Sequence, residues 1–243
     1  MTASRIFRAI LLVSAGLVAA PTEADTADLR GDPEAVEAIQ RMMDRFGGDA
    51  VWSRARSLYL EYDGWRTEPN EPVIERAWRD LAEPWQRSEY EGRSFHTVYA
   101  MTPDVSWLYR YHTGELTPFD AESHAQSRAR YPFGFYTILH AFAAGDPRLR
   151  LEWQAPDTVI AYNTASSAVS HWRTDSTGAL IAWRTVLADG SSFAYLYGPM
   201  QNFGLVDFPA WGIAEDGSWR WNYTRVEISS EPPPVSFEPP DGG

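Results

Sequence analysis

Short segments in which apolar and polar residues alternate dominate this sequence. Each is rich in aromatic and β-branched residues and is bounded by Pro, Gly, Asn or Asp. Alternation with a period of two is typical of β-strands, and connectors this short join antiparallel neighbours. The sequence therefore predicts an antiparallel meander of about a dozen strands. The segments are Ser57–Trp65, Val73–Leu81, Trp85–Gly92, Ser94–Met101, Val105–His112, Leu149–Gln154, Thr158–Asn163, Ala168–Thr174, Ala179–Val186, Ser192–Gly198, residues 202–209 and Trp219–Ile228.

Two segments have helical spacing instead. Residues 33–46 carry an apolar residue every three or four positions, with Asp32 as the expected N-cap and Pro33 as the first helical residue. Pro132–Ala144 is apolar with the same spacing, which predicts a helix buried against the sheet or across its mouth. Residues 113–131 are polar without a clear period, and we expect them to be irregular.

The N-terminus has the outline of a secretory signal peptide. Arg5 and Arg8 form a positive start, residues 9–20 are apolar, and residues 22–24 supply small side chains for cleavage. The apolar run is short for a membrane span, so we predict that residues 1–24 are cleaved as a signal peptide. The alternative is that this segment is retained as an N-terminal anchor. No Cys follows the run, which excludes a lipid-attachment cysteine.

Nothing in the remaining chain divides it into two domains. We expect a flexible start over residues 25–32, a single domain over 33–230, and an extended Pro-rich tail over 231–243 that is poorly held beyond Phe237. Aromatic residues make up 14% of the chain, which is typical of a sheet with a large core.

Composition excludes several kinds of function. The sequence has no Cys, so it has neither disulfides nor thiolate chemistry. Its net charge of −12 opposes binding of nucleic acid or anionic lipid headgroups through a basic surface. We therefore expect no nucleic-acid partner and no stable membrane insertion after signal cleavage.

The strand faces predict a concavity. Leu58, Leu60 and Tyr62 form one apolar face of the first strand, and Trp107 and Tyr109 lie on an apolar face of the fifth. The predicted fold class is α+β: a strongly curved antiparallel sheet, or half-barrel, wraps an N-terminal helix and a mid-chain helix. If the helices do not fill the concave side, an aromatic-lined pocket remains for a lipid-sized ligand. The alternative is that the helices fill it and every aromatic residue belongs to the core.

The order of features resembles the outer-membrane lipoprotein-carrier (LolA-like) family over residues 33–240. The resemblance rests on a Gly47-Gly48 and Trp52 step before the first strand, a third strand that opens after Pro84, and a closing Phe237–Pro240 piece. It implies a half-barrel that holds acyl chains or lipidated proteins beneath a helical lid, with Pro132–Ala144 as the lid or plug. It does not single out the carriers' functional arginine, for which four residues compete: Arg66, Arg76, Arg79 and Arg87.

No motif for chemistry is present. The five histidines have no metal-ligand spacing, and His140 in the apolar segment fits a hydrogen-bonded structural role. The sequence has no nucleophile elbow and no nucleotide-binding loop, so we predict a protein that is not an enzyme and has no metal or cofactor. A hydrolase with a non-sequential site built from Glu61, Asp63 and His96 is the less favoured alternative.

The predicted function is reversible binding of a hydrophobic ligand in the periplasm or outside the cell. The partner would be a hydrophobic small molecule or lipid, or a lipidated or envelope protein. An envelope sensor or protein-interaction module is the alternative. The candidate cavity or lid residues are Trp65, Trp78, Trp107, Tyr109, Phe135, Ile138, Leu139 and Phe142.

Overall fold

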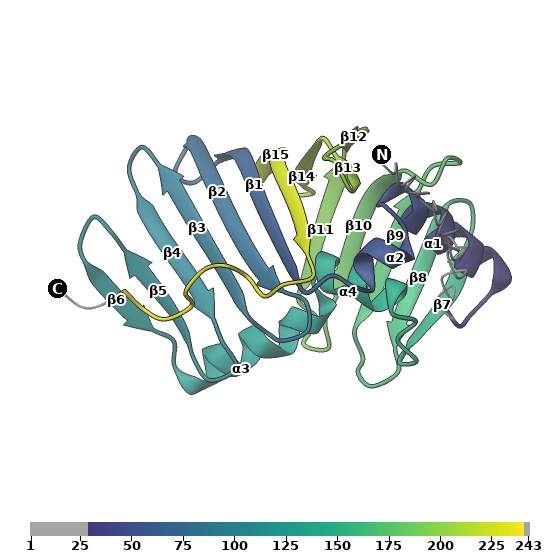
Figure 1. The fold of residues 1–243 in the computed structure, drawn as a ribbon, viewed down its shortest axis with the longest axis horizontal. Coiled ribbons are helices and arrows are strands. Elements are labelled where there is room, and N and C mark those ends of the chain that lie inside the picture. The colour runs from purple at the N-terminus through teal and green to yellow at the C-terminus, as the bar shows by residue number, and fades with distance from the viewer. Residues whose placement is uncertain (1–28, 241–243) are drawn as a thin grey trace, which may run out of the picture.

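A curved antiparallel sheet of 13 strands forms the body of the protein in the computed structural model, which describes residues 29–240 (Figure 1). The strand order is β6-β5-β4-β3-β2-β1-β15-β14-β11-β10-β9-β8-β7, so the sheet is open at β6 and β7. This confirms the predicted α+β half-barrel. The predicted signal peptide lies outside the described residues.

Eleven of the predicted segments coincide with strands. Residues 202–209, predicted as one strand, instead contain a turn between two short strands, and strands β6 and β14 were not predicted. A separate hairpin, β12-β13, stands beside the large sheet. The bounds are β1 Ser57–Arg66, β2 Glu71–Asp80, β3 Gln86–Gly92, β4 His96–Met101, β5 Ser106–Arg110, β6 Glu115–Pro118, β7 Leu149–Gln154, β8 Thr158–Asn163, β9 Val169–Thr174, β10 Leu180–Val186, β11 Ser192–Tyr197, β12 Met200–Asn202, β13 Asp207–Pro209, β14 Trp211–Ala214 and β15 Trp219–Ser229.

Both predicted helices are present. α1 (Pro33–Arg45) buries its apolar stripe, and α4 (Phe135–Ala143) follows a short 3₁₀ turn, η1 (Tyr131–Phe133). A single-turn helix, α2 (Asp49–Trp52), leads into β1. Within residues 29–240 no helix has the length and apolar character needed to span a bilayer.

Asp32 does not cap α1 with its side chain, contrary to the prediction. It precedes the helix in an extended conformation, and its Oδ2 accepts a hydrogen bond from the Trp153 backbone N–H at 3.0 Å. The carboxylate therefore ties the start of α1 to strand β7. At this position the hydrogen bond from Trp153 takes the place of the side-chain cap that an Asp usually gives to a helix.

The segment predicted to be irregular, residues 113–131, is ordered instead. It forms the edge strand β6 and helix α3 (Ala121–Arg130). The Asp120 carboxylate accepts a hydrogen bond from the Ser123 N–H at 2.7 Å and so caps the helix. No residue of α3 is fully buried, and a helix without an apolar face leaves no periodic signal in the sequence.

The two faces of the sheet differ in what covers them. We call the side that carries Leu58 and Leu60 the inner face, and the helices α1 and α4 pack there in one large core. The opposite side is the outer face. Strand register places Trp107 on the outer face, in one row with Trp78 and Tyr59. Trp107 therefore belongs to a second, smaller core with Val98 and Ala100.

Aromatic rings fill the inner core over β8–β11 and β15. Phe135 of α4 stacks on Trp172 at 5.3 Å between ring centroids, and Phe142 meets the same indole edge-on at 5.2 Å. Phe46 contacts Phe208 of β13 at 5.1 Å. Close packing of large rings means that α4 plugs this part of the concavity.

Candidate functional site

A cleft of about 930 Å³ lies on the other side of α4, away from its buried aromatic rings. Its walls are the β2–β3 loop, the helical elbow formed by α3, η1 and α4, and one end of strands β8–β10. Most lining residues are apolar, and a few polar groups stand among them. They are Leu81, Ala82, Glu83, Pro84, Ala125, Arg128, Ala129, Tyr131, Pro132, Phe133, Thr137, Ile138, His140, Ala141, Ala144, Asp146, Pro147, Arg148, Leu149, Ala161, Asn163, Ala168, Val169, Ser170 and Thr185.

The helical elbow is clamped to the sheet at its bend. The buried Tyr131 hydroxyl donates a hydrogen bond to the Asp80 carbonyl at the end of β2, and it lies 3.3 Å from the Trp85 carbonyl. Thr137 Oγ1 donates to the Tyr131 carbonyl at 3.0 Å. Burial raises the pKa of Tyr131, so its hydroxyl keeps the proton that it donates. The bend between α3 and α4 is therefore fixed to the sheet.

The polar groups of the cleft are few and mostly paired. His140 Nδ1 donates to the Trp52 carbonyl at 2.7 Å, which confirms the predicted structural, hydrogen-bonded role. Arg148 Nε donates to Asp146 Oδ1 at 2.9 Å. Hydrogen bonding from the Arg148 side chain holds the pKa of Asp146 below its usual value. An apolar pocket with a few oriented polar groups is the usual architecture of a small-molecule site.

The structure distributes the predicted cavity residues over three places. Ile138 lines the cleft. Phe135, Leu139 and Phe142 lie on the opposite side of α4, within the inner core. The other four, Trp65, Trp78, Trp107 and Tyr109, lie on the outer face. Their contact with a ligand stays a prediction.

Sequence reasoning missed the side chains that build most of the cleft. Ala125 and Ala129 of α3 line it, yet small exposed alanines on a polar helix carry no hydrophobic signal. The one local cue was Asp120, an N-cap residue in front of good helix formers.

A polar cluster interrupts the inner face on β1–β3. Glu75 of β2 is 7% exposed. The Arg66 guanidinium lies over the Tyr90 ring at 4.5 Å, and Arg79 Nη1 donates to Gln86 Oε1 at 2.6 Å. Within the described residues, the buried Nε atoms of both arginines have no hydrogen-bond partner.

Burial shifts the pKa of the Glu75 carboxyl upward from its ordinary value. The charges of Arg79 and Arg66 and hydrogen bonds from Tyr90 and Ser88 oppose the rise without cancelling it. The folded protein therefore binds a proton at Glu75 more tightly than the unfolded chain does. Stability from this group is present at low pH and is lost as the pH rises from the ordinary carboxyl pKa through the raised value.

The variant Glu75→Gln tests the direction of this pH dependence of stability. The variant resembles the protonated carboxyl, so we expect a higher free energy of unfolding than that of the wild type at pH 7. The difference should shrink as the pH falls and vanish below the ordinary carboxyl pKa. Urea unfolding of both proteins between pH 3 and pH 8 measures it, with exposed Glu122→Gln as the control. A variant that is less stable at pH 7 would show that the charged form is favoured.

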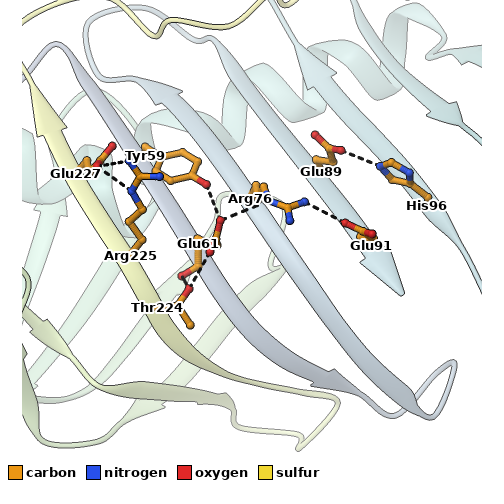
Figure 2. A network of polar contacts seen from close by, with 9 residues as sticks. All are labelled: Tyr59, Glu61, Arg76, Glu89, Glu91, His96, Thr224, Arg225 and Glu227. Carbon is orange, nitrogen blue, oxygen red and sulfur yellow. Dashed lines mark hydrogen bonds and ion pairs between the residues drawn. The ribbon is translucent and has the colours of Figure 1, made fainter. Parts of the chain in front are cut away.

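Two residues of the alternative hydrolase site, Glu61 and His96, lie on the outer face among a series of ion pairs (Figure 2), and strand register places Asp63 on the same face. Glu61 accepts hydrogen bonds from Tyr59 at 2.9 Å and Thr224 at 3.3 Å, and it pairs with Arg76 at 3.4 Å. Burial, reinforced by Glu61, raises the pKa of Tyr59 to about 12.

His96 has a different partner. Its Nε2 lies 2.8 Å from Glu89 Oε1, and Arg76, which is bonded to Glu61 and Glu91, stands on the strand between the two groups (Figure 2). Cross-strand pairs of this kind stabilise a sheet face. No group of three or more His, Asp or Glu side chains able to hold a metal ion occurs in residues 29–240.

Comparison with known proteins gives similarities of low identity. No family model matches the chain, and no curated protein matches it. Three solved structures are similar. A DUF1329 family protein from Desulfovibrio piger ATCC 29098 has a TM-score of 0.45 and 10% identity, over 84% of this chain and 97% of that chain. An uncharacterized conserved protein from Thermus thermophilus has a TM-score of 0.32 and 13% identity, over 81% of this chain and 88% of that chain.

The third similar structure is that of MucB, with a TM-score of 0.29 and 9% identity, over 87% of this chain and 64% of that chain. At these scores the similarities carry no functional argument. The resemblance to lipoprotein carriers therefore stays a prediction.

Proposed function

We propose that this protein is an exported binding protein of the cell envelope that holds a hydrophobic ligand, such as a lipid or the acyl chains of a lipoprotein. The observation that carries the proposal is the cleft beside α4, with a volume of about 930 Å³ and a mainly apolar lining. Pockets for small molecules span roughly 300–1,000 Å³. Burial of apolar surface, worth about 25 cal/mol per Å², drives the binding.

The two long halves of the elbow have different roles in this proposal. α4 is the plug, because its aromatic side packs into the inner core. α3 is the lid, because none of its residues is fully buried and small motions cost it little apolar contact. Arg128 and the Asp146–Arg148 pair stand at the cleft and orient a polar headgroup.

A bulky residue in the cleft tests the proposal. We expect Ala129→Trp to weaken binding of a fluorescent fatty acid at least tenfold, because the indole occupies the cleft wall. Ala50→Trp is the matched control, since both alanines are exposed and helical and Ala50 does not line the cleft. Fluorescence titration gives the affinities, and circular dichroism checks folding.

Native mass spectrometry of the purified chain gives the independent readout. A co-purified lipid that is lost in Ala129→Trp and kept in Ala50→Trp would support the proposal. If the fatty acid binds both variants as tightly as it binds the wild type, and no lipid co-purifies, the cleft is not a ligand site.

A further inference from the structure

The C-terminal tail, residues 230–240, lies on the outer face and crosses β1–β5 as an extended segment (Figure 1). Within it only Phe237 is buried, at 6% exposed. The Phe237 ring meets Trp85 edge-on at 5.1 Å, and its carbonyl accepts a hydrogen bond from Trp107 Nε1 at 3.0 Å. Arg87 Nη1 donates to the Ser236 carbonyl at 3.3 Å.

Side chains of the sheet hold the tail, and strand pairing does not. No β-ladder includes residues 230–240, and the tail N–H groups of Glu231 and Glu238 bond to nearby serine hydroxyls. Indole N–H groups that donate to peptide carbonyls, beside aromatic rings that contact the side chains, are how proteins bind proline-rich extended peptides. The tail, with five prolines in residues 230–240, is such a peptide.

The surface beneath the tail is larger than the tail itself. We call it the tail groove and define it by Tyr59, Trp78, Trp85, Arg87 and Trp107. Two hollows remain beside the bound segment. One, of about 440 Å³, lies between Tyr59, Trp78 and the prolines 232 and 234, and the other, of about 490 Å³, lies between Trp85 and the prolines 232 and 233. The tail is held by one buried residue, Phe237, and leaves space beside it, so another peptide can take its place in the groove.

The groove also carries a positive charge. Arg87 stacks on Trp107 with 5.9 Å from its guanidinium carbon to the ring, and its buried Nε has no hydrogen-bond partner in the described part of the chain. The tail that faces it carries two exposed acidic residues, Glu231 and Glu238. A cation on an aromatic floor favours an acidic segment.

We propose that the tail groove recognises proline-rich, acidic peptide segments of a partner protein that carry an aromatic anchor, and that the chain's own C-terminal tail occupies the groove in cis. This surface lies on the face of the sheet opposite to the cleft. Glu83 lines both the cleft and the hollow beside Trp85, and peptide recognition does not require the proposed ligand binding.

The test frees the groove within the full-length chain. Phe237→Ala removes the anchor, and the probe is a fluorescein-labelled synthetic peptide of residues 230–240. We expect the peptide to bind Phe237→Ala at least tenfold more tightly than the wild type, where the tethered tail competes. Fluorescence anisotropy measures both affinities.

Two matched variants locate the binding. Adding Trp107→Phe to Phe237→Ala should weaken peptide binding about tenfold, because the indole donor is lost. Adding Trp65→Phe should leave it unchanged, since Trp65 donates to the Asn70 side chain on the same face and does not contact the tail. A peptide with its five prolines replaced by alanine should bind several-fold more weakly, because it is not preorganised.

The proposal is overturned if a folded Phe237→Ala does not bind the peptide, if the two tryptophan variants behave alike, or if the alanine peptide binds equally well. Should Phe237→Ala fail to fold, a second experiment uses a chain that keeps Phe237. A dye on Glu238→Cys, in a chain without other cysteines, reports the tail position. Excess unlabelled peptide should displace the tail and change the emission with saturation, and an emission that does not change rejects the proposal.

Discussion

Replacing Trp172 by alanine is expected to lower the free energy of unfolding by about 3–5 kcal/mol. Trp172 is 0% exposed and lies where α4 meets the sheet. It stacks on Phe135, meets Phe142 edge-on, and lies 6.1 Å from the Trp183 ring. Its Nε1 also donates to Ser170 Oγ at 2.8 Å. Loss of the indole leaves a cavity that a close-packed aromatic core cannot refill.

Urea unfolding followed by far-ultraviolet circular dichroism measures this loss without relying on tryptophan fluorescence. Leu205→Ala is the control, because that side chain is 71% exposed and its truncation should cost less than about 1 kcal/mol. Similar losses at the two positions would mean that α4 is not a plug, and the division of roles between α3 and α4 would then fail with it.

Replacing Asp80 by alanine is the second change with a large expected effect, a loss of about 3 kcal/mol. Asp80 is 4% exposed at the end of β2. One carboxylate oxygen accepts hydrogen bonds from the N–H groups of Ala82 at 2.9 Å and Glu83 at 3.0 Å. The other pairs with Arg56 at 2.8 Å. Removal leaves two backbone donors and one guanidinium without their acceptor.

Two further variants separate these contributions. Asp80→Asn keeps an oxygen for the backbone donors and loses the charge, whereas Arg56→Ala removes only the ion pair, which is partly exposed on the arginine side. We expect each to cost about 1 kcal/mol, well below the loss in Asp80→Ala. Because residues 81–84 form a wall of the cleft, Asp80→Ala should also weaken fatty-acid binding. A loss no larger than that of Arg56→Ala would show that the loop does not depend on the carboxylate.

The sheet and two of its helices were predictable because their signals are local. Alternation with a period of two marked strands such as β9 and β10, and helical spacing marked α1 and α4. Helix α3 escaped prediction because it buries no residue, so selection for a core left no period in it.

The function-bearing surfaces were less predictable than the elements that form them. The sequence pattern shows that Trp107 lies on an apolar face of its strand. Which face of the sheet that is depends on the register of every strand pair from β1 to β5. A shift of one residue in any pair would have moved it to the other side. The place of the C-terminal tail follows from the same register, since Trp107 holds Phe237.

By itself, the sequence determined the class of the protein: an antiparallel, aromatic-rich sheet with apolar helices and no motif for metal or nucleotide chemistry in its printed residues. Only the tertiary structure decided where the hollows are. The cleft joins residues 81–84, 125–129 and 161–170, and the tail groove joins strands β1–β5 to residues 230–240. The physical reason is that periodicity records whether a side chain is buried, whereas a cleft depends on which distant segments meet and leave space between them.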